Sequence, residues 1–140
     1  MEIRIKKVHS EAIIPRFAHP GDAGMDLFAV EETIIAPGER VQIPTGLAFE
    51  LPDGHVGLVW DKSGLSHNHG LKTLGGVLDA GYRGELLVGL VNLSTEIYTI
   101  ERGDKIAQLL IQKIERPDIV EMAELSDSSR GIGGFGSTGK

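Results

Sequence analysis

The segment Gly75–Asn92 contains the side chains best suited to chemistry. Its sequence is GGVLDAGYRGELLVGLVN, in which a Gly-rich polar centre separates two apolar runs, and this pattern is typical of a hairpin. Asp79 and Tyr82 stand in that centre, where a plain turn would need only Asn-Gly. A carboxylate and a phenol on a stiff ribbon can form a small pocket. A surface hairpin with a turn-forming Asp is the alternative interpretation.

A second carboxylate, Asp26, interrupts the apolar run Met25–Val30 just after a Gly-rich turn. A buried carboxylate destabilises the fold unless it has a partner. Two interpretations stay open. Asp26 caps backbone amides at a strand end, or it has a catalytic or metal-linked role.

The stretch DKSGLSHNHG, which ends at Gly70, has helix-like traits. Ser63 is expected to be the N-cap and Gly70 the stop signal of a helix of about two turns. The unpaired amides of a helix N-terminus next to Lys62 favour a phosphate ligand. His67 and His69 alone would make a weak metal site, so we expect them to be solvated surface residues.

Composition limits the classes of function. The 140 residues, 41% of them hydrophobic, fit one domain with a real core. A formal charge of -6 argues against nucleic-acid binding, because such proteins normally carry a basic face. The sequence has no cysteine, no apolar signal region at its start and no apolar run of membrane-spanning length. We therefore expect a cytoplasmic protein that does not enter membranes.

Short apolar or alternating runs separated by Gly and Pro predict an all-β barrel or sandwich with one short helix. The expected strands lie in the ranges Glu2–Val8, Met25–Val30, Thr33–Leu51, His55–Trp60, Val77–Leu78, Leu86–Val91, Thr95–Glu101 and Lys105–Ile114. A last acidic strand or extension is expected over Ile119–Leu125. The run Ile106–Ile111 should be buried on both faces. Gln108 within it either satisfies a backbone group or points its amide into a pocket.

The composition changes at Ser126 to SDSSRGIGGFGSTGK, which cannot pack a core and should be mobile when no ligand is bound. A lid that closes over a phosphorylated base could use the cation of Arg130, the ring of Phe135 and the hydroxyls of Ser137 and Thr138. A disordered tail is the alternative. The expected organisation is a β-barrel domain over residues 1–125 and a flexible C-terminal arm over residues 126–140.

Five motifs together resemble the trimeric dUTPase family, from Ala23 to Gly139. They are AGMDLFA from Ala23, KSGL from Lys62, GVLDAGYRG from Gly76, GDKIAQL from Gly103 and RGIGGFGSTG from Arg130. Each motif alone is weak evidence, but five in this order are highly specific.

The resemblance implies a distorted β-barrel of jelly-roll type, a homotrimer with shared active sites, and hydrolysis of dUTP to dUMP and pyrophosphate with Mg²⁺. Asp79 would activate the attacking water, and Asp26 would reach the Mg²⁺ through water. Tyr82 would lie under the deoxyribose, the hairpin backbone would read uracil, and Phe135 would stack on the base. The implied substrate-binding residues are Lys62, Ser63, Gly64, Thr73, Gly76, Tyr82, Gln108, Arg130, Phe135, Gly136, Ser137 and Thr138. Charge neutralisation by the metal suits phosphoryl chemistry in an acidic chain.

Two positions depart from the family pattern. Lys62 stands where Arg usually precedes Ser-Gly, so phosphate charge is kept while the bidentate fork is lost. Thr73 stands where some relatives have Asn near the base, which leaves the uracil contacts open. Three other functions are alternatives: a dCTP-directed enzyme on the same fold, a nucleotide-binding regulator without turnover, and a structural β-domain with a disordered tail.

Overall fold

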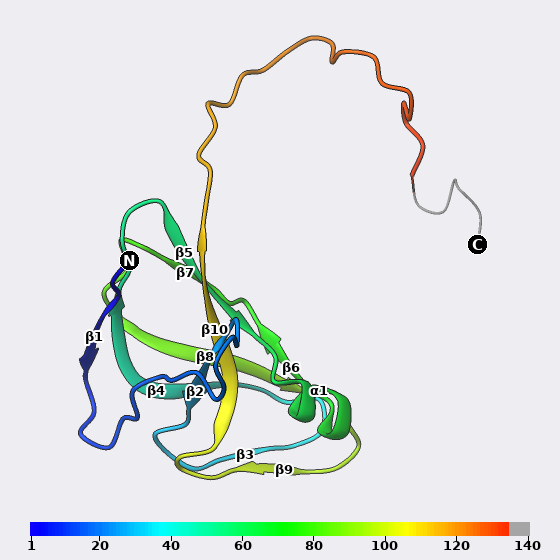
Figure 1. Ribbon diagram of the computed structural model, residues 1–140. Helices are drawn as coiled ribbons and strands as arrows, with labels where there is room; N and C mark the ends of the chain where they lie inside the picture. The colour runs from blue at the N-terminus through cyan, green and yellow to red at the C-terminus, as the bar shows by residue number, and fades with distance from the viewer. Residues whose placement is uncertain (135–140) are drawn as a thin grey trace.

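Residues 1–134 are described by the computed structural model, and β-strands dominate them (Figure 1). The strands are β1 (Arg4–Lys7), β2 (Met25–Phe28), β3 (Thr33–Ile35), β4 (Arg40–Glu50), β5 (His55–Trp60), β6 (Leu71–Leu74), β7 (Val77–Asp79), β8 (Glu85–Asn92), β9 (Tyr98–Ile100) and β10 (Lys105–Lys113). One helix, α1 (Ser63–His69), is found among the described residues. In this part of the chain no helix is long and apolar enough to cross a bilayer.

The strands form two four-stranded sheets and one two-stranded sheet. The first sheet has the order β1-β4-β8-β6, the second has the order β2-β10-β5-β7, and β3 pairs with β9. All the pairings are antiparallel. The sheets do not close on themselves, so the jelly-roll-like all-β fold is confirmed as an open arrangement and not as a sealed barrel.

Both four-stranded sheets contribute to one apolar core. Strand β8 shows the cause, because Leu86, Val88 and Leu90 alternate with more exposed residues and point to the same side. Leu27 in β2 and Leu109 in β10 enter the same core from the second sheet and are fully buried. The core holds the ends of β2, β5 and β10 in fixed positions relative to one another.

The sequence predicts that the two strands within Gly75–Asn92 pair with each other as a hairpin, and this prediction is wrong. Strand β7 pairs with β5 in one sheet, whereas β8 lies between β4 and β6 in the other. Because β8 already has a partner on each side, it offers no free edge to β7. Asp79 therefore ends an edge strand, and the chain crosses there from one sheet to the other.

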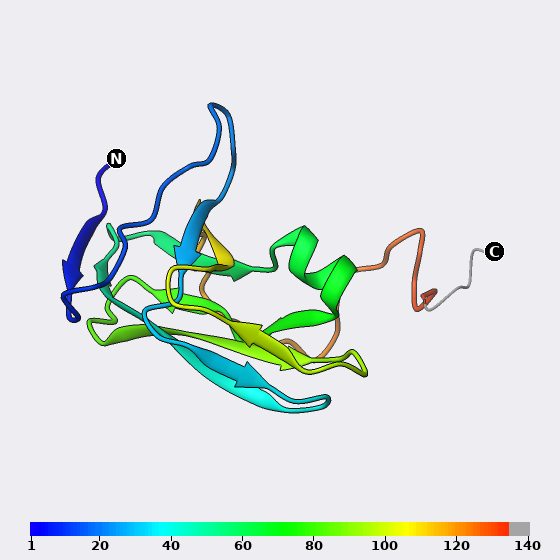
Figure 2. The same ribbon diagram turned by 90° about the horizontal axis from the view of Figure 1, so that it is seen from below.

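The N-cap of helix α1 lies one residue earlier than the sequence predicts. Lys62 occupies this position and makes no side-chain capping bond, and Ser63 is the first helical residue. Gly70 ends the helix with a φ of 68°, a conformation that favours glycine, so the stop signal is confirmed. Figure 2 shows α1 at the end of the body away from the N-terminus.

The last part of the described chain leaves the β-body as an extended segment (Figure 1). The sequence predicts either a strand or an extension over Ile119–Leu125. The structure has no strand there, so the extension is the interpretation that is confirmed. Strand β10 is buried on both faces only over its first half, where Ile106 and Ala107 are successive buried residues.

Candidate active site

A buried carboxylate with two lysines lies where β2, β10 and β5 run side by side. Asp26 is 2% exposed, and its Oδ1 lies 2.5 Å from Nζ of Lys62. Nζ of Lys105 lies 2.8 Å from Oδ2, although this oxygen has no oriented hydrogen bond among the described residues. The expectation that Asp26 caps backbone amides is therefore wrong, because its partners are ammonium groups.

The two lysines decide the charge of Asp26. Burial alone would raise the pKa of this carboxyl, but Lys105 and Lys62 outweigh burial and hold the pKa below its usual value. Asp26 is therefore ionised at neutral pH, and two cations are held at the ends of three strands.

A second ion pair lies on the other side of the same segment. Asp61 follows β5 directly, and its Oδ1 accepts a hydrogen bond of 2.7 Å from the backbone amide of Thr73 in β6. Nζ of Lys72 lies 2.9 Å from Oδ2 of Asp61. Sequence reasoning missed this role for Asp61, since nothing in the local pattern signals a contact with β6.

Gln108 satisfies a backbone group, which is the first of its two expected roles. Its Nε2 donates a hydrogen bond of 2.9 Å to the carbonyl oxygen of Asp61. Its Oε1 lies above Gly24, where an added Cβ would approach to 2.5 Å. Gly24 of the first motif therefore makes room for Gln108 of the fourth, and the two motifs form one packing unit.

The turn after β7 is fixed by hydrogen bonds to its own backbone. The amide of Tyr82 donates to the carbonyl of Asp79 at 3.1 Å, and the Tyr82 hydroxyl donates to the carbonyl of Glu85 at 3.1 Å. Nη1 of Arg83 donates to the carbonyls of Ala80 at 2.6 Å and of Tyr82 at 2.9 Å. The carboxylate of Asp79 is exposed and has no side-chain hydrogen bond within residues 1–134.

Thr73 and Gly76 lie together in a hollow of about 250 Å³ beside the end of β5. Its lining consists of Leu58, Val59, Trp60, Lys72, Thr73, Gly75, Gly76 and Val77. Gly76 has a φ of 105°, and a Cβ there would lie 2.7 Å from the carbonyl oxygen of Val59. The turn is therefore restricted to glycine by both conformation and space.

Within one chain the structure separates the predicted residues into two groups. Asp79 pairs with Val56 near the start of β5, whereas Lys62 lies just beyond the other end of that strand. Lys62 is six positions after Val56, and six steps along an extended chain correspond to about 20 Å. Ser63 and Gly64 follow Lys62 and are exposed at the start of α1.

The C-terminal residues of the predicted site are described only in part. Arg130 is exposed, and its Nε donates to the carbonyl of Gly133 at 2.7 Å in a local turn. The predictions for Phe135, Gly136, Ser137 and Thr138 lie outside the described residues.

His67 and His69 are exposed, as expected. Across residues 1–134 no three His, Asp or Glu side chains gather as a metal site.

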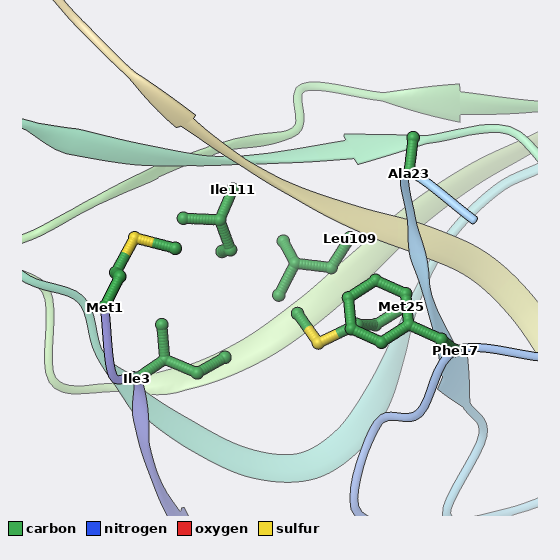
Figure 3. Close-up of a pocket in the computed structure, with 7 residues that line it drawn as sticks. All are labelled: Met1, Ile3, Phe17, Ala23, Met25, Leu109 and Ile111. Atoms are coloured by element: carbon green, nitrogen blue, oxygen red, sulfur yellow. The ribbon is translucent and has the colours of Figure 1, made fainter. Parts of the chain in front are cut away.

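An apolar pocket of about 270 Å³ lies away from these residues, between the segment that precedes β1 and strands β2 and β10. Figure 3 shows its side chains pointing toward one another, with sulfur atoms from two methionines. The pocket is lined by Met1, Ile3, Phe17, Ala23, Met25, Leu109 and Ile111. It carries no charged side chain, so it is no candidate for binding a triphosphate.

Comparison with known proteins gives one consistent result. The dUTPase family model matches residues 10–139. The deoxyuridine 5'-triphosphate nucleotidohydrolase of Clostridium kluyveri is 50% identical over 99% of this chain and 99% of its own length. The corresponding protein of Thermobifida fusca is 49% identical over 99% of this chain and 79% of its own length.

Solved structures agree with the sequence matches. The dUTPase of Staphylococcus bacteriophage 80alpha with dUpNHpp superposes with a TM-score of 0.93 at 32% identity, and 99% of each chain is covered. A mutant form of the dUTPase from phage phi11 of S. aureus, described with a structural Mg(II) ion, has a TM-score of 0.83 at 29% identity. That match covers 89% of this chain and 98% of the phage chain. The chain belongs to the dUTPase family.

Proposed function

We propose that this protein hydrolyses dUTP to dUMP and pyrophosphate, with Asp79 as the base that activates water. The family match over residues 10–139 and the names of the relatives support the reaction. One structural observation supports the base: Asp79 is exposed at the end of β7 and its carboxylate is unpaired within residues 1–134. A general base needs a free oxygen within reach of the water that it deprotonates.

The turn after Asp79 would hold the nucleoside. Tyr82 is half exposed, and its hydroxyl is bonded to the backbone of the same turn, so its ring is a fixed surface for deoxyribose. Gly76 and Thr73 line the neighbouring hollow, which is the proposed location of uracil. A base beside the sugar reaches the α-phosphorus first, which places the attack there.

The phosphates would lie at the segment that starts with Lys62. The amides of Ser63 and Gly64 open α1, and Gln108 is bonded to the residue before Lys62. Lys62 is paired with Asp26, and Lys105 is the second cation beside that carboxylate. Lys62 can therefore turn to a phosphate while Asp26 keeps one partner.

The residues present suit Mg²⁺ that arrives with the nucleotide. Mg²⁺ is usually bound through few carboxylates, several waters and the substrate phosphates, so a full cage of protein ligands is not required. The Oδ2 atom of Asp26 is buried without an oriented hydrogen bond among the described residues, which leaves it able to accept one from a metal-bound water. When bound, the ion would neutralise charge on the triphosphate.

Residues 126–140 are proposed to act as an arm that closes over the site of a body formed by residues 1–125. Residues 126–132 of the arm are exposed, and the described part of the arm adds no residue to the core, which suits a segment that orders on the ligand. Arg130, Phe135, Gly136, Ser137 and Thr138 would then complete the contacts to phosphates and base.

A homotrimer with shared sites is supported by the separation within one chain. Asp79 and Lys62 lie near opposite ends of β5, about 20 Å apart, so one chain does not present both to the same substrate. The extended segment also exposes apolar side chains, including Ile119 at 97% and Leu125 at 89%. Exposed apolar side chains on such a segment suit contact with another protein surface. Association of copies would cover it.

The cytoplasmic location and the lack of a nucleic-acid partner are also proposals. The absence of cysteine suits a reducing cytoplasm, and the charge of -6 offers no basic surface for nucleic acid. A dCTP-directed enzyme and a regulator without turnover were the alternatives. The names of the matched relatives favour dUTP and hydrolysis over both.

Hydrolysis in oxygen-18 water tests the reaction and the position of attack. With dUTP, dCTP, dTTP and UTP as substrates and Mg²⁺ present, we expect turnover of dUTP first and oxygen-18 in dUMP. Label in pyrophosphate would show attack at the β-phosphorus and would contradict the role of Asp79. Addition of EDTA should lower the rate.

A further inference from the structure

Asp61 joins three elements at the point where β5 ends. We propose that Asp61 is a positioning residue that fixes the base-side strand β6 against the phosphate-side segment beginning at Lys62. This inference rests on the proposed function, because it takes Thr73 to be near the base and Lys62 near the phosphates.

The carboxylate of Asp61 forms two of the three links. Its Oδ1 accepts the Thr73 amide at 2.7 Å, and its Oδ2 lies 2.9 Å from Nζ of Lys72. The Asp61 side chain is 20% exposed, so water competes only in part for these bonds. Hydrogen bonds to an ionised acceptor are roughly twice as strong as neutral ones.

The backbone of Asp61 forms the third link. Its carbonyl oxygen accepts a hydrogen bond of 2.9 Å from Nε2 of Gln108 in β10. The residue is therefore held on one side by β10 and on the other side by β6. Since Lys62 is the next residue in the chain, its backbone position follows from the same contacts.

The topology explains why β6 needs such a link. Strand β6 is the last strand of its sheet and pairs only with β8. The Thr73 amide points away from β8, because it donates to Asp61 at the end of β5 in the other sheet. An edge strand has unpaired amides along its outer side. Asp61 captures one of them and ties the edge of one sheet to the second sheet.

Kinetics with two nucleotides separate positioning from simple stability. Asp61→Ala leaves the Thr73 amide without its acceptor, and we expect kcat/KM for dUTP to fall about tenfold, the size of one charged hydrogen bond. The ratio of kcat/KM for dUTP to that for dCTP should fall by about threefold or more, because the base-side strand moves. A merely structural role would lower both values equally, so an unchanged ratio overturns the proposal.

Lys72 offers a rescue test that does not depend on the Ala variant folding. Asp61→Asn keeps an oxygen that can accept from the Thr73 amide, but it turns an amide group toward Lys72. We therefore expect kcat/KM to fall by about threefold. Combining it with Lys72→Met removes this clash and should restore kcat/KM to within about twofold of the parent. Lys72→Met alone is the reference for the double variant, and it should lose less kcat/KM than Asp61→Ala because the Thr73 amide keeps its acceptor. If kcat/KM of the double variant is no higher than that of Asp61→Asn, the proposed link between Asp61 and the Thr73 amide is contradicted.

Amide hydrogen exchange follows the link without turnover. In the double variant Asp61→Asn with Lys72→Met, the exchange rate of the Thr73 amide should stay near the parent value. In Asp61→Ala the same amide should exchange at least about tenfold faster. The amide of Asn92, which donates to the carbonyl of Glu39, is the control and should not change. If the parent fails to hydrolyse dUTP, the proposed function is wrong. Unchanged Thr73 exchange in Asp61→Ala instead refutes the role of Asp61.

Discussion

Asp26 and Asp79 are both carboxylates that the sequence marks for chemistry, yet the fold holds them in opposite ways. Asp26 is 2% exposed and faces two lysines. Asp79 is exposed, and no side chain within residues 1–134 is hydrogen bonded to it. A carboxylate that accepts a proton from water needs a free oxygen. A carboxylate between two ammonium groups organises those cations instead.

The surroundings of the two residues follow the same division. The turn after Asp79 is held by bonds between Arg83 or Tyr82 and backbone carbonyls, so a neutral side chain at position 79 leaves these bonds in place. Removal of the Asp26 charge would leave Lys62 and Lys105 facing each other without compensation, which is destabilising. A substitution at 79 should therefore report on chemistry, and one at 26 on both chemistry and stability.

Asp79→Asn should have the largest effect on turnover. The substitution keeps the shape of the side chain and removes the base, so kcat should fall by roughly 10² to 10⁴. Binding of dUpNHpp, measured by calorimetry, should stay near the parent value. Asp53→Asn, at an exposed carboxylate in another turn, is the matched control and should leave kcat unchanged. Loss of nucleotide binding in Asp79→Asn would make this residue structural.

Deletion of residues 130–140 should reduce turnover next most strongly. These residues add no side chain to the described core, but they are proposed to exclude water and position the terminal phosphates, and poor positioning costs about 10² in rate. The midpoint of thermal unfolding should not change. A truncated protein with the parent's kcat and KM would show that the segment is only a tail.

Lys62 belongs to the Asp26 side of this comparison, because it is paired with Asp26 and is proposed to bind phosphate. Lys62→Ala should raise KM for dUTP and lower kcat, with a combined loss of roughly tenfold to a hundredfold for a charged hydrogen bond. Lys62→Arg should be tolerated, since it keeps the charge and adds a planar fork. Steady-state kinetics that match the parent in Lys62→Ala would confine Lys62 to its ion pair with Asp26.

The fold was predictable from the sequence where one local pattern determines the outcome. The alternating apolar residues of β8 and the glycine at 70 that ends α1 are examples. The family motifs likewise predicted the jelly-roll-like class. The pairing of β7 was not predictable from its own residues, because it depends on β8 having partners on both sides.

The candidate site was predictable in its residue types but not in its contacts. Asp26 and Lys62 were both named, yet their ion pair joins residues 36 positions apart and has no local signal. The part of Asp61 was missed for the same reason, since its acceptor role needs β6 to fold back beside β5.

The smallest effect concerns the dependence of stability on pH at Asp61, which resembles Asp26 in having a lysine partner and lies between Asp26 and Asp79 in exposure. Burial alone would raise the pKa of Asp61, but the bonds from Lys72 and Thr73 outweigh burial and lower the pKa below the usual value of 3.8. A carboxyl with a lowered pKa in the folded state stabilises the fold above the unfolded pKa, and this stabilisation is lost as the pH falls through the folded value. The free energy of unfolding of the parent should therefore exceed that of Asp61→Asn by about 1 kcal/mol at pH 7. The difference should shrink below pH 3.8, where the unfolded chain and then the folded chain take up the proton. Urea unfolding of both proteins from pH 7 to pH 3 measures it, with Asp53→Asn as an exposed control that should show no such convergence. A difference that stays constant across this range would mean that the Asp61 charge adds nothing to the fold and that only the shape of its side chain holds Thr73.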